Sequence, residues 1–145
     1  MKKIIIISLA LIIGAMSLNS CKKYEEGPGV SLRSKKARIT GEWKLVKHTD
    51  DGIDYSEGLD TEKVIYNFEK DGAVTISFND ENGAVETFQA TWEWGASKES
   101  VEISFNFFGL SSTEKYPIVK LTNKEMIWEG PDSFGDIVRQ EFEKQ

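Results

Sequence analysis

The chain has 145 residues, a formal net charge of −6, one cysteine and one histidine. Once an apolar N-terminal segment is set aside, this length supports one modest globular domain. The composition excludes a disulfide-stapled domain, a zinc-finger scaffold, a cysteine protease and a basic nucleic-acid binder, so we expect no nucleic acid among its partners.

The first twenty residues have the pattern of an export signal. Lys2 and Lys3 give a positive start, and residues 4–16 (IIIISLALIIGAM) form an apolar run. This run is too short to cross a bilayer core as a helix, which needs about 20 residues. A charged start followed by a short apolar stretch is typical of a secretory signal, so we predict a signal peptide over residues 1–20.

A short motif, Leu18-Asn19-Ser20-Cys21, ends this segment. It resembles the lipobox of bacterial lipoproteins, which implies cleavage before Cys21, lipidation of its sulfur and usually a further acyl chain on its amine. Two or more acyl chains hold a protein stably on a bilayer. The resemblance predicts an exported protein, lipid-anchored through Cys21 in the bacterial cell envelope at the outer membrane. An ordinary signal peptide that leaves a free cysteine is the alternative.

The next segment differs in charge from the rest of the chain. Residues 22–38 hold six basic and two acidic groups, whereas residues 39–145 hold ten basic and 22 acidic groups. A polar segment with few apolar residues is typical of a linker. We predict a lipidated N-terminus and flexible tether over residues 21–38 and one domain over residues 39–145. The last turn before the domain, residues 32–39, is expected to be a short helix.

From Thr40 onward, apolar and polar residues alternate with the period of two that β-strands show. Tight hairpin turns are indicated at Asp71-Gly72 and Asn82-Gly83, and the one long connection is Thr49–Asp60. Hairpin follows hairpin, so we predict an all-β fold, an eight-stranded antiparallel up-and-down β-barrel preceded by a short helical turn, with a β-sandwich as the alternative. The expected strands lie near residues 43–45, 64–68, 74–78, 88–94, 101–107, 116–121, 125–129 and 134–143.

Gly41-Glu42-Trp43 on the first strand resembles the Gly-x-Trp motif of the lipocalins. Further shared cues are GEWKLV, NFEKDG and YPIVKLTNKEMIW, so the whole stretch from Thr40 to Lys144 is similar to the lipocalin-like domains of small bacterial lipoproteins. The resemblance implies that Trp43 closes one end of the barrel against a basic residue, with Gly41 beside it. Arg139, on the last expected strand, is the candidate for this basic partner.

The sequence offers little for catalysis, so we expect no enzyme, no catalytic residues, no cofactor and no metal. His48 is the only histidine and is expected to lie exposed at a strand end, and no nucleophile-elbow pattern accompanies a serine. The connection after the first strand is acidic but lacks the ordered spacing of a calcium-binding loop. Its carboxylates belong to Asp50, Asp51, Asp54, Glu57 and Asp60.

Aromatic residues are the most informative group in the domain, because they either fill the barrel or line an apolar pocket. In the first case the protein is a solid barrel that binds an envelope protein as an inhibitor or accessory subunit. In the second, a monomeric, membrane-anchored, non-enzymatic barrel binds a small apolar or amphipathic ligand in or at its mouth. We favour this function and expect the rings to fill most or all of the barrel interior. The candidate ligand-binding residues are Tyr55, Tyr66, Phe88, Trp92, Trp94, Phe105 and Trp128.

Overall fold

The computed structural model describes residues 33–59 and 63–145. The predicted signal peptide, the lipobox-like motif and Cys21 lie outside these residues, as does most of the predicted tether. Within residues 33–59 and 63–145, no helix has the length and apolar character needed to span a membrane.

A short helix, α2 (Lys35–Ile39), precedes the first strand, as the sequence predicts. Ser34 caps it, because its Oγ accepts a hydrogen bond from the backbone N–H of Ala37 at 3.1 Å. Arg38 and Ile39 are buried, and Arg38 donates from a guanidinium nitrogen to the carbonyl oxygen of Leu121 at 2.7 Å. The end of the segment assigned to the tether therefore packs against the domain.

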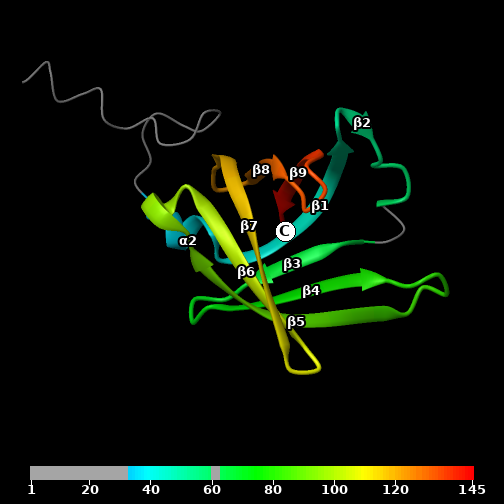
Figure 1. Ribbon diagram of the computed structural model, residues 1–145, viewed down its shortest axis with the longest axis horizontal. Coiled ribbons are helices and arrows are strands. Elements are labelled where there is room, and N and C mark those ends of the chain that lie inside the picture. Colours follow the sequence, from blue (N-terminus) through cyan, green and yellow to red (C-terminus); the bar gives the residue numbers. More distant parts are fainter. Residues whose placement is uncertain (1–32, 60–62) are drawn as a thin grey trace, which may run out of the picture.

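Eight antiparallel strands close a barrel in simple up-and-down order, which confirms the predicted fold over the sandwich (Figure 1). Each strand pairs with the next along the chain, and pairing of the first strand with the last closes the sheet. The two-residue strand β2 only extends the pairing of β1. The strands are β1 (Gly41–Asp50), β2 (Ile53–Asp54), β3 (Ile65–Phe68), β4 (Ala73–Asn79), β5 (Val85–Trp94), β6 (Ser100–Phe107), β7 (Leu110–Leu121), β8 (Glu125–Pro131) and β9 (Ile137–Lys144); a 3-10 turn, η2 (Ala96–Lys98), links β5 to β6.

Aspartate and glycine shape the first two hairpins. The carboxylate of Asp71 accepts the backbone N–H of Ala73, and Gly72 has a φ of +101°. In the next hairpin, the carboxylate of Asp80 accepts the backbone N–H groups of Asn82 and Ala84 at 2.9 and 2.7 Å. These hydrogen bonds replace the ladder where the chain reverses direction.

The strand β7 is longer than predicted. The sequence predicts this strand over residues 116–121, but Ser111, Ser112 and Thr113 also pair with β6, and the hydroxyls of Thr113 and Ser104 lie 2.7 Å apart. The chain instead reverses at Phe108-Gly109, both with positive φ. Small polar residues resemble a loop in sequence, yet they pair as a strand because the neighbouring β6 ladder accepts them.

The two ends of the barrel differ. The end beside α2, which we call the closed end, holds the fully buried rings of Trp43, Phe68 and Phe142 and the buried side chains of Leu121 and Met126. The opposite end, which we call the open end, carries the connection after β1 and the β4–β5, β6–β7 and β8–β9 hairpins (Figure 1). The buried rings of Trp43, Phe68 and Phe142 fill the closed end, so a pocket has to be sought toward the open end.

Candidate functional site

The barrel wall opens between β7 and β8 because their ladder ends early. The two strands pair from Ile118 with Trp128 to Leu121 with Met126, and no further toward the open end. The backbone N–H of Ile118 donates to Glu99 on the β6 side, so by strand alternation the backbone of Pro117 faces β8, where proline has no N–H to donate.

Gly130, on β8, stands beside this proline. A Cβ added to Gly130 would lie 2.9 Å from Cδ of Pro117, so the close approach of the two strands requires glycine there. Beyond this contact β7 stays paired with β6 and β8 stays paired with β9, which leaves a gap between the two pairs of strands.

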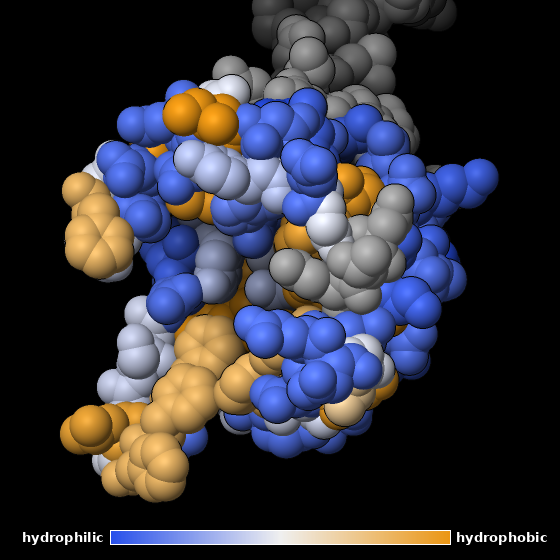
Figure 2. Space-filling model, turned by 90° about the vertical axis from the view of Figure 1, so that its right-hand side faces the viewer, coloured by the Kyte–Doolittle hydropathy of each residue, from blue (hydrophilic) through white to orange (hydrophobic). Residues whose placement is uncertain are grey.

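A cavity of about 460 Å³ occupies this gap. Its size falls within the range of small-molecule sites, which run from about 300 to about 1,000 Å³. Figure 2, which looks into the open end, shows the barrel hollowed on this side. We call this cavity the cleft. Its walls are formed by Tyr66, Thr113, Glu114, Lys115, Tyr116, Pro117, Trp128, Glu129, Gly130, Pro131, Asp132, Ser133, Val138 and Gln140.

Three stacked or edge-on aromatic rings form the inner wall of the cleft. The ring centroids of Tyr116 and Trp128 lie 4.6 Å apart, and those of Tyr66 and Trp128 lie 5.6 Å apart. Phe142 packs behind Trp128, with a centroid distance of 4.5 Å. This packing fixes the rings against the filled closed end, so the wall is preformed.

The polar groups of the cleft come from both of its sides. The hydroxyl of Tyr116 donates to the carboxylate of Glu114. Burial, and secondly Glu114, raise the pKa of the Tyr66 hydroxyl to about 12. Burial and the hydrogen bond to Glu114 likewise raise the pKa of Tyr116. Both tyrosines therefore remain protonated at neutral pH, and the hydroxyl of Tyr116 donates its hydrogen bond to the carboxylate of Glu114.

A hydrogen-bonded chain runs along the opposite side of the cleft. The indole N–H of Trp128 donates to Oε1 of Gln140 at 2.6 Å, and Nε2 of Gln140 lies 3.1 Å from Nδ1 of His48. An indole can only donate, so the amide oxygen of Gln140 must face Trp128 and its NH₂ group must face His48. His48 Nδ1 is thus the acceptor, which places the imidazole proton on Nε2. The side chain of His48 is half-buried at this position, whereas the sequence predicts an exposed residue at the end of the strand.

A strip of phenylalanine rings lines β4, β5 and β6 toward the open end, and we call it the aromatic strip. The ring of Phe88 stacks on Phe78 with centroids 5.6 Å apart and meets Phe107 edge-on at 6.1 Å. Phe105 stacks on Phe107 at 6.0 Å. Figure 2 shows apolar side chains running outward from the hollow along this side.

The predicted ligand-binding residues fall into four places. Tyr66 and Trp128 line the cleft, and Phe88 and Phe105 belong to the aromatic strip. Trp92 is buried toward the closed end, where its indole N–H donates to the carbonyl of Glu69 and its ring meets Phe68 and Trp94 edge-on. Tyr55 lies on the connection after β1, half exposed, with its ring centroid 6.4 Å from that of His48.

Sequence reasoning missed Glu114, Tyr116, Val138 and Gln140 as residues of the cleft. Tyr116 and Val138 follow from strand alternation once the strands are placed. Glu114 and Gln140 carry no such signal, because a polar residue in an alternating strand ordinarily marks the outer face.

At the closed end, Lys144 is the basic partner of Trp43. Its Nζ lies 4.9 Å from the centre of the indole ring and donates to the carbonyl oxygens of Arg38 and Thr40 at 2.7 and 2.6 Å. The indole N–H of Trp43 donates to the carbonyl of Ile39 at 2.6 Å. Burial, and secondly the charge of Arg33, lower the pKa of Lys144.

Gly41 makes room for this lysine. It has a φ of +118°, and a Cβ at this position would lie 3.0 Å from Cε of Lys144. The expectation that Arg139 would pack on Trp43 was wrong. Arg139 pairs in register with Thr49, toward the open end, and forms ion pairs with Glu129 at 3.2 Å and Glu141 at 3.1 Å.

With this geometry in view, comparison with known protein families gives a match to the lipocalin-like domain over residues 39–128, which is more than half of the chain. The chain belongs to this family. The match begins at Ile39, immediately before the Gly41 and Trp43 that form the closed end, and ends at Trp128 in the cleft wall.

Solved structures share the fold of this lipocalin-like domain. A lipocalin-like protein from Bacteroides uniformis is 18% identical, with a TM-score of 0.56 over 74% of this chain and 99% of that one. An uncharacterized protein from Bacteroides eggerthii is 17% identical, with a TM-score of 0.51 over 73% and 98% of the two chains. A comparison with curated proteins gave no match.

Two acidic residues near the mouth of the lipocalin-like domain, Asp51 and Asp54, accept hydrogen bonds from its own backbone. The carboxylate of Asp51 accepts the N–H of Ile137 at 2.9 Å, and that of Asp54 accepts the N–H of Ser56 at 2.9 Å. Hydrogen bonds from Ser56 lower the pKa of Asp54. In the part of the chain that the structure describes, which excludes Asp60, no group of three or more His, Cys, Asp or Glu side chains is arranged to hold a metal ion.

Proposed function

We propose that this lipocalin-like domain binds a small apolar or amphipathic molecule in the cleft between β7 and β8, and that its role is binding rather than catalysis. The observation that carries the proposal is the cleft itself, a cavity of about 460 Å³ in a barrel whose other end is filled. A space of this size beside the packed rings of the closed end supports a ligand site.

The lining of the cleft supports a ligand with a large apolar part. Tyr66, Tyr116 and Trp128 present ring surface, and Val138 adds an aliphatic side chain from β9. Burying each 100 Å² of apolar ligand surface contributes roughly 2.5 kcal/mol before the cost of association is subtracted. The few polar groups orient the ligand, as is usual in small-molecule sites.

The proposal is tested by filling the cleft. Val138→Trp adds an indole to the wall, so we expect it to weaken binding of the neutral fluorescent dye Nile red about tenfold or more. Val85→Trp is the matched control, because Val85 is exposed on the β4–β5 hairpin, away from the cleft. Titrations of the dye measure affinity, and circular dichroism checks that both variants fold. Equal binding by all three proteins would remove the cleft as the ligand site.

A second function, binding of an envelope protein, is supported by apolar side chains that are exposed at the open end. Phe108 is fully exposed at the tip of the β6–β7 hairpin, and Phe134 is almost as exposed on the β8–β9 hairpin. Under this alternative, Phe108→Ser combined with Phe134→Ser abolishes capture of a partner from envelope extracts and leaves dye binding intact. Under the cleft proposal, the Val138→Trp variant loses the dye.

We also propose that the protein is exported and anchored in the outer membrane through Cys21. The motif Leu18-Asn19-Ser20-Cys21 supports this proposal. Cys21→Ala removes the sulfur that would carry the lipid, so cell fractionation should show the variant released from the membrane fraction. A membrane pool that persists in the variant would refute lipidation as the anchor.

A further inference from the structure

We infer that the cleft selects ligands that carry a positive charge, namely organic amines or quaternary ammonium compounds with an apolar group. The inference rests on the proposed function, because it names the class of ligand for the same cleft. The juxtaposition that carries it is the carboxylate of Glu114 beside the rings of Tyr66, Tyr116 and Trp128.

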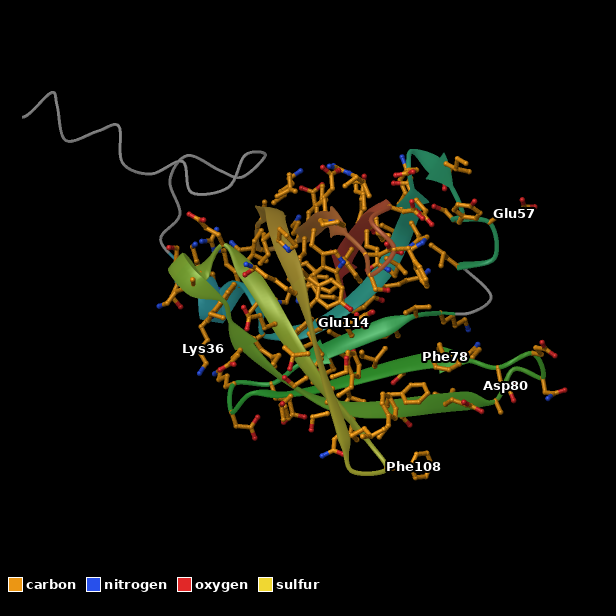
Figure 3. The ribbon with its side chains drawn as sticks, in the orientation of Figure 1. Lys36, Glu57, Phe78, Asp80, Phe108 and Glu114 are labelled. Carbon is orange, nitrogen blue, oxygen red and sulfur yellow. The ribbon has the colours of Figure 1, made fainter. Side chains whose placement is uncertain are left out.

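Glu114 faces the cleft from β7. It lines the cavity together with Tyr116, two residues further along the same face of the strand, and accepts the hydroxyl hydrogen bond of that tyrosine. Glu114 stands opposite the fully buried Ile103 in the ladder, on the inner face of the barrel, and Figure 3 shows it near the middle of the view, with Glu57 and Asp80 toward the edge. Glu114 is solvent-accessible, so a ligand that enters the cleft can reach its carboxylate.

The basic residues near the cleft are directed elsewhere. Lys115, the one basic residue among those that line the cavity, follows Glu114 and stands opposite Glu102 in the ladder, on the outer face of the barrel. Arg139 is held by Glu129 and Glu141. No ion pair to Glu114 is formed within residues 33–59 and 63–145, so its charge is open to a ligand cation.

A second carboxylate extends the negative charge to the rim of the cleft. Asp132, at the end of β8, accepts the backbone N–H groups of Phe134, Gly135 and Asp136 at 2.8 to 3.1 Å. These amides orient the carboxylate without adding a positive side chain. An anionic ligand would meet the carboxylates of Glu114 and Asp132, which attract a cation, whereas Glu129, the third carboxylate of the lining, is paired with Arg139.

The aromatic wall of the cleft also attracts a cation, as the carboxylates do. The face of an aromatic ring carries negative charge density, so it attracts a cation, and the attraction grows as water is excluded. Tyr66 and Tyr116 have pKa values raised by burial, so both stay neutral and keep this ring character. A ligand carboxylate would face the rings and Glu114, while Lys115, the one basic residue of the lining, stands on the outer face of the barrel.

Calorimetry with three ligands of equal chain length tests the inference on the purified full chain. The ligands are octyltrimethylammonium, octanoate and octanol, each below its micelle concentration. We expect octyltrimethylammonium to bind at least about tenfold tighter than octanoate, because Glu114 and the faces of the aromatic rings attract the cation and repel the carboxylate. Raising the salt concentration should weaken binding of the cation and leave octanol unchanged.

Glu114→Gln is the decisive variant, because it removes the charge and keeps an oxygen acceptor for Tyr116. It should weaken binding of the cation about tenfold and leave octanol unchanged. Glu81→Gln is the matched control, since it makes the same charge change on the exposed β4–β5 turn and should alter neither affinity. If Glu114→Gln does not fold, the salt dependence of the wild-type protein decides the question instead.

The outcomes separate the two levels of the proposal. Octanoate binding as tightly as the cation, or a Glu114→Gln variant that keeps the full affinity for the cation, would overturn the charge selection while octanol binding still supports the cleft as a ligand site. If none of the three ligands binds the wild-type protein, the ligand-binding function falls together with the charge selection.

Discussion

The closed and open ends of this barrel are made of the same strands but use their polar groups in opposite ways. At the closed end, Lys144 donates two hydrogen bonds to backbone carbonyls and lies over the ring of Trp43. The indole N–H of Trp43 donates to the carbonyl of Ile39. At the open end, the carboxylate of Glu114 accepts a hydrogen bond from the hydroxyl of Tyr116 and also lines the cleft.

The difference shows how one small fold separates stability from binding. The buried groups of Trp43 and Lys144 at the closed end help to hold the barrel together, because their N–H groups donate to backbone carbonyls inside the protein. Groups with unused capacity at the open end contribute less to folding and are available to a ligand. The predictions below test this division, beginning with the largest effect.

Removing the indole at the closed end should be the most damaging change. Trp43→Ala deletes a fully buried ring and should lower the free energy of unfolding by about 3–5 kcal/mol. Phe108→Ala removes a fully exposed ring at the open end and should change it by less than about 0.5 kcal/mol. Urea titrations measure both values. Similar losses in the two variants would break the division between the ends.

The stability of the protein at alkaline pH should show that the hydroxyl of Tyr66 in the inner wall of the cleft is buried. The pKa of Tyr66 is raised to about 12 in the folded protein, against 10.0 for the free side chain. The stability this group contributes is therefore complete below pH 10 and is lost as pH rises through 12, by up to about 2–3 kcal/mol. Tyr66→Phe should remove that part of the decline. Parallel pH profiles of denaturant unfolding would contradict the buried position of Tyr66.

The identity of the basic partner gives the smallest and sharpest test. Lys144→Met keeps the length of the side chain but loses its charge, and should cost about 1–2 kcal/mol of unfolding free energy through the hydrogen bonds and the cation–π contact. Arg139→Met, on the same strand, breaks two partly exposed ion pairs and should cost no more than about 1 kcal/mol. The reverse order would restore Arg139 to the role expected from the sequence.

The sequence predicts the barrel well because strand alternation and hairpin turns are local signals. Trp43 and Gly41 could be singled out because their motif lies within three residues. The partner of Trp43 could not be, because it depends on the register between β1 and β9. A bulge between Leu45 and Lys47 shifts that register along β1, so counting residues back from either end gives no answer.

The cleft was only partly predictable for a related reason. Tyr66 and Trp128 stand out as aromatic residues on the inner face of alternating strands. The opening between β7 and β8 arises from Pro117 and Gly130, which are distant in sequence and meet only in the folded barrel. Glu114 is selected by its neighbours in space, so its sequence context marks it as an ordinary surface residue.

The ladder between β1 and β9 ties the folding of the barrel to the order of its synthesis. Hairpins such as β4–β5 and β6–β7 form from neighbouring residues, but β1 waits for β9, the last strand of the barrel to be made. Such distant pairings form slowly, because the loop between them must first be closed. Until β9 pairs with β1, one edge of β1 is unpaired and Trp43 lacks its contact with Lys144. A barrel without β9 therefore exposes an unpaired strand edge that favours aggregation, and pairing of β9 with β1 covers that edge.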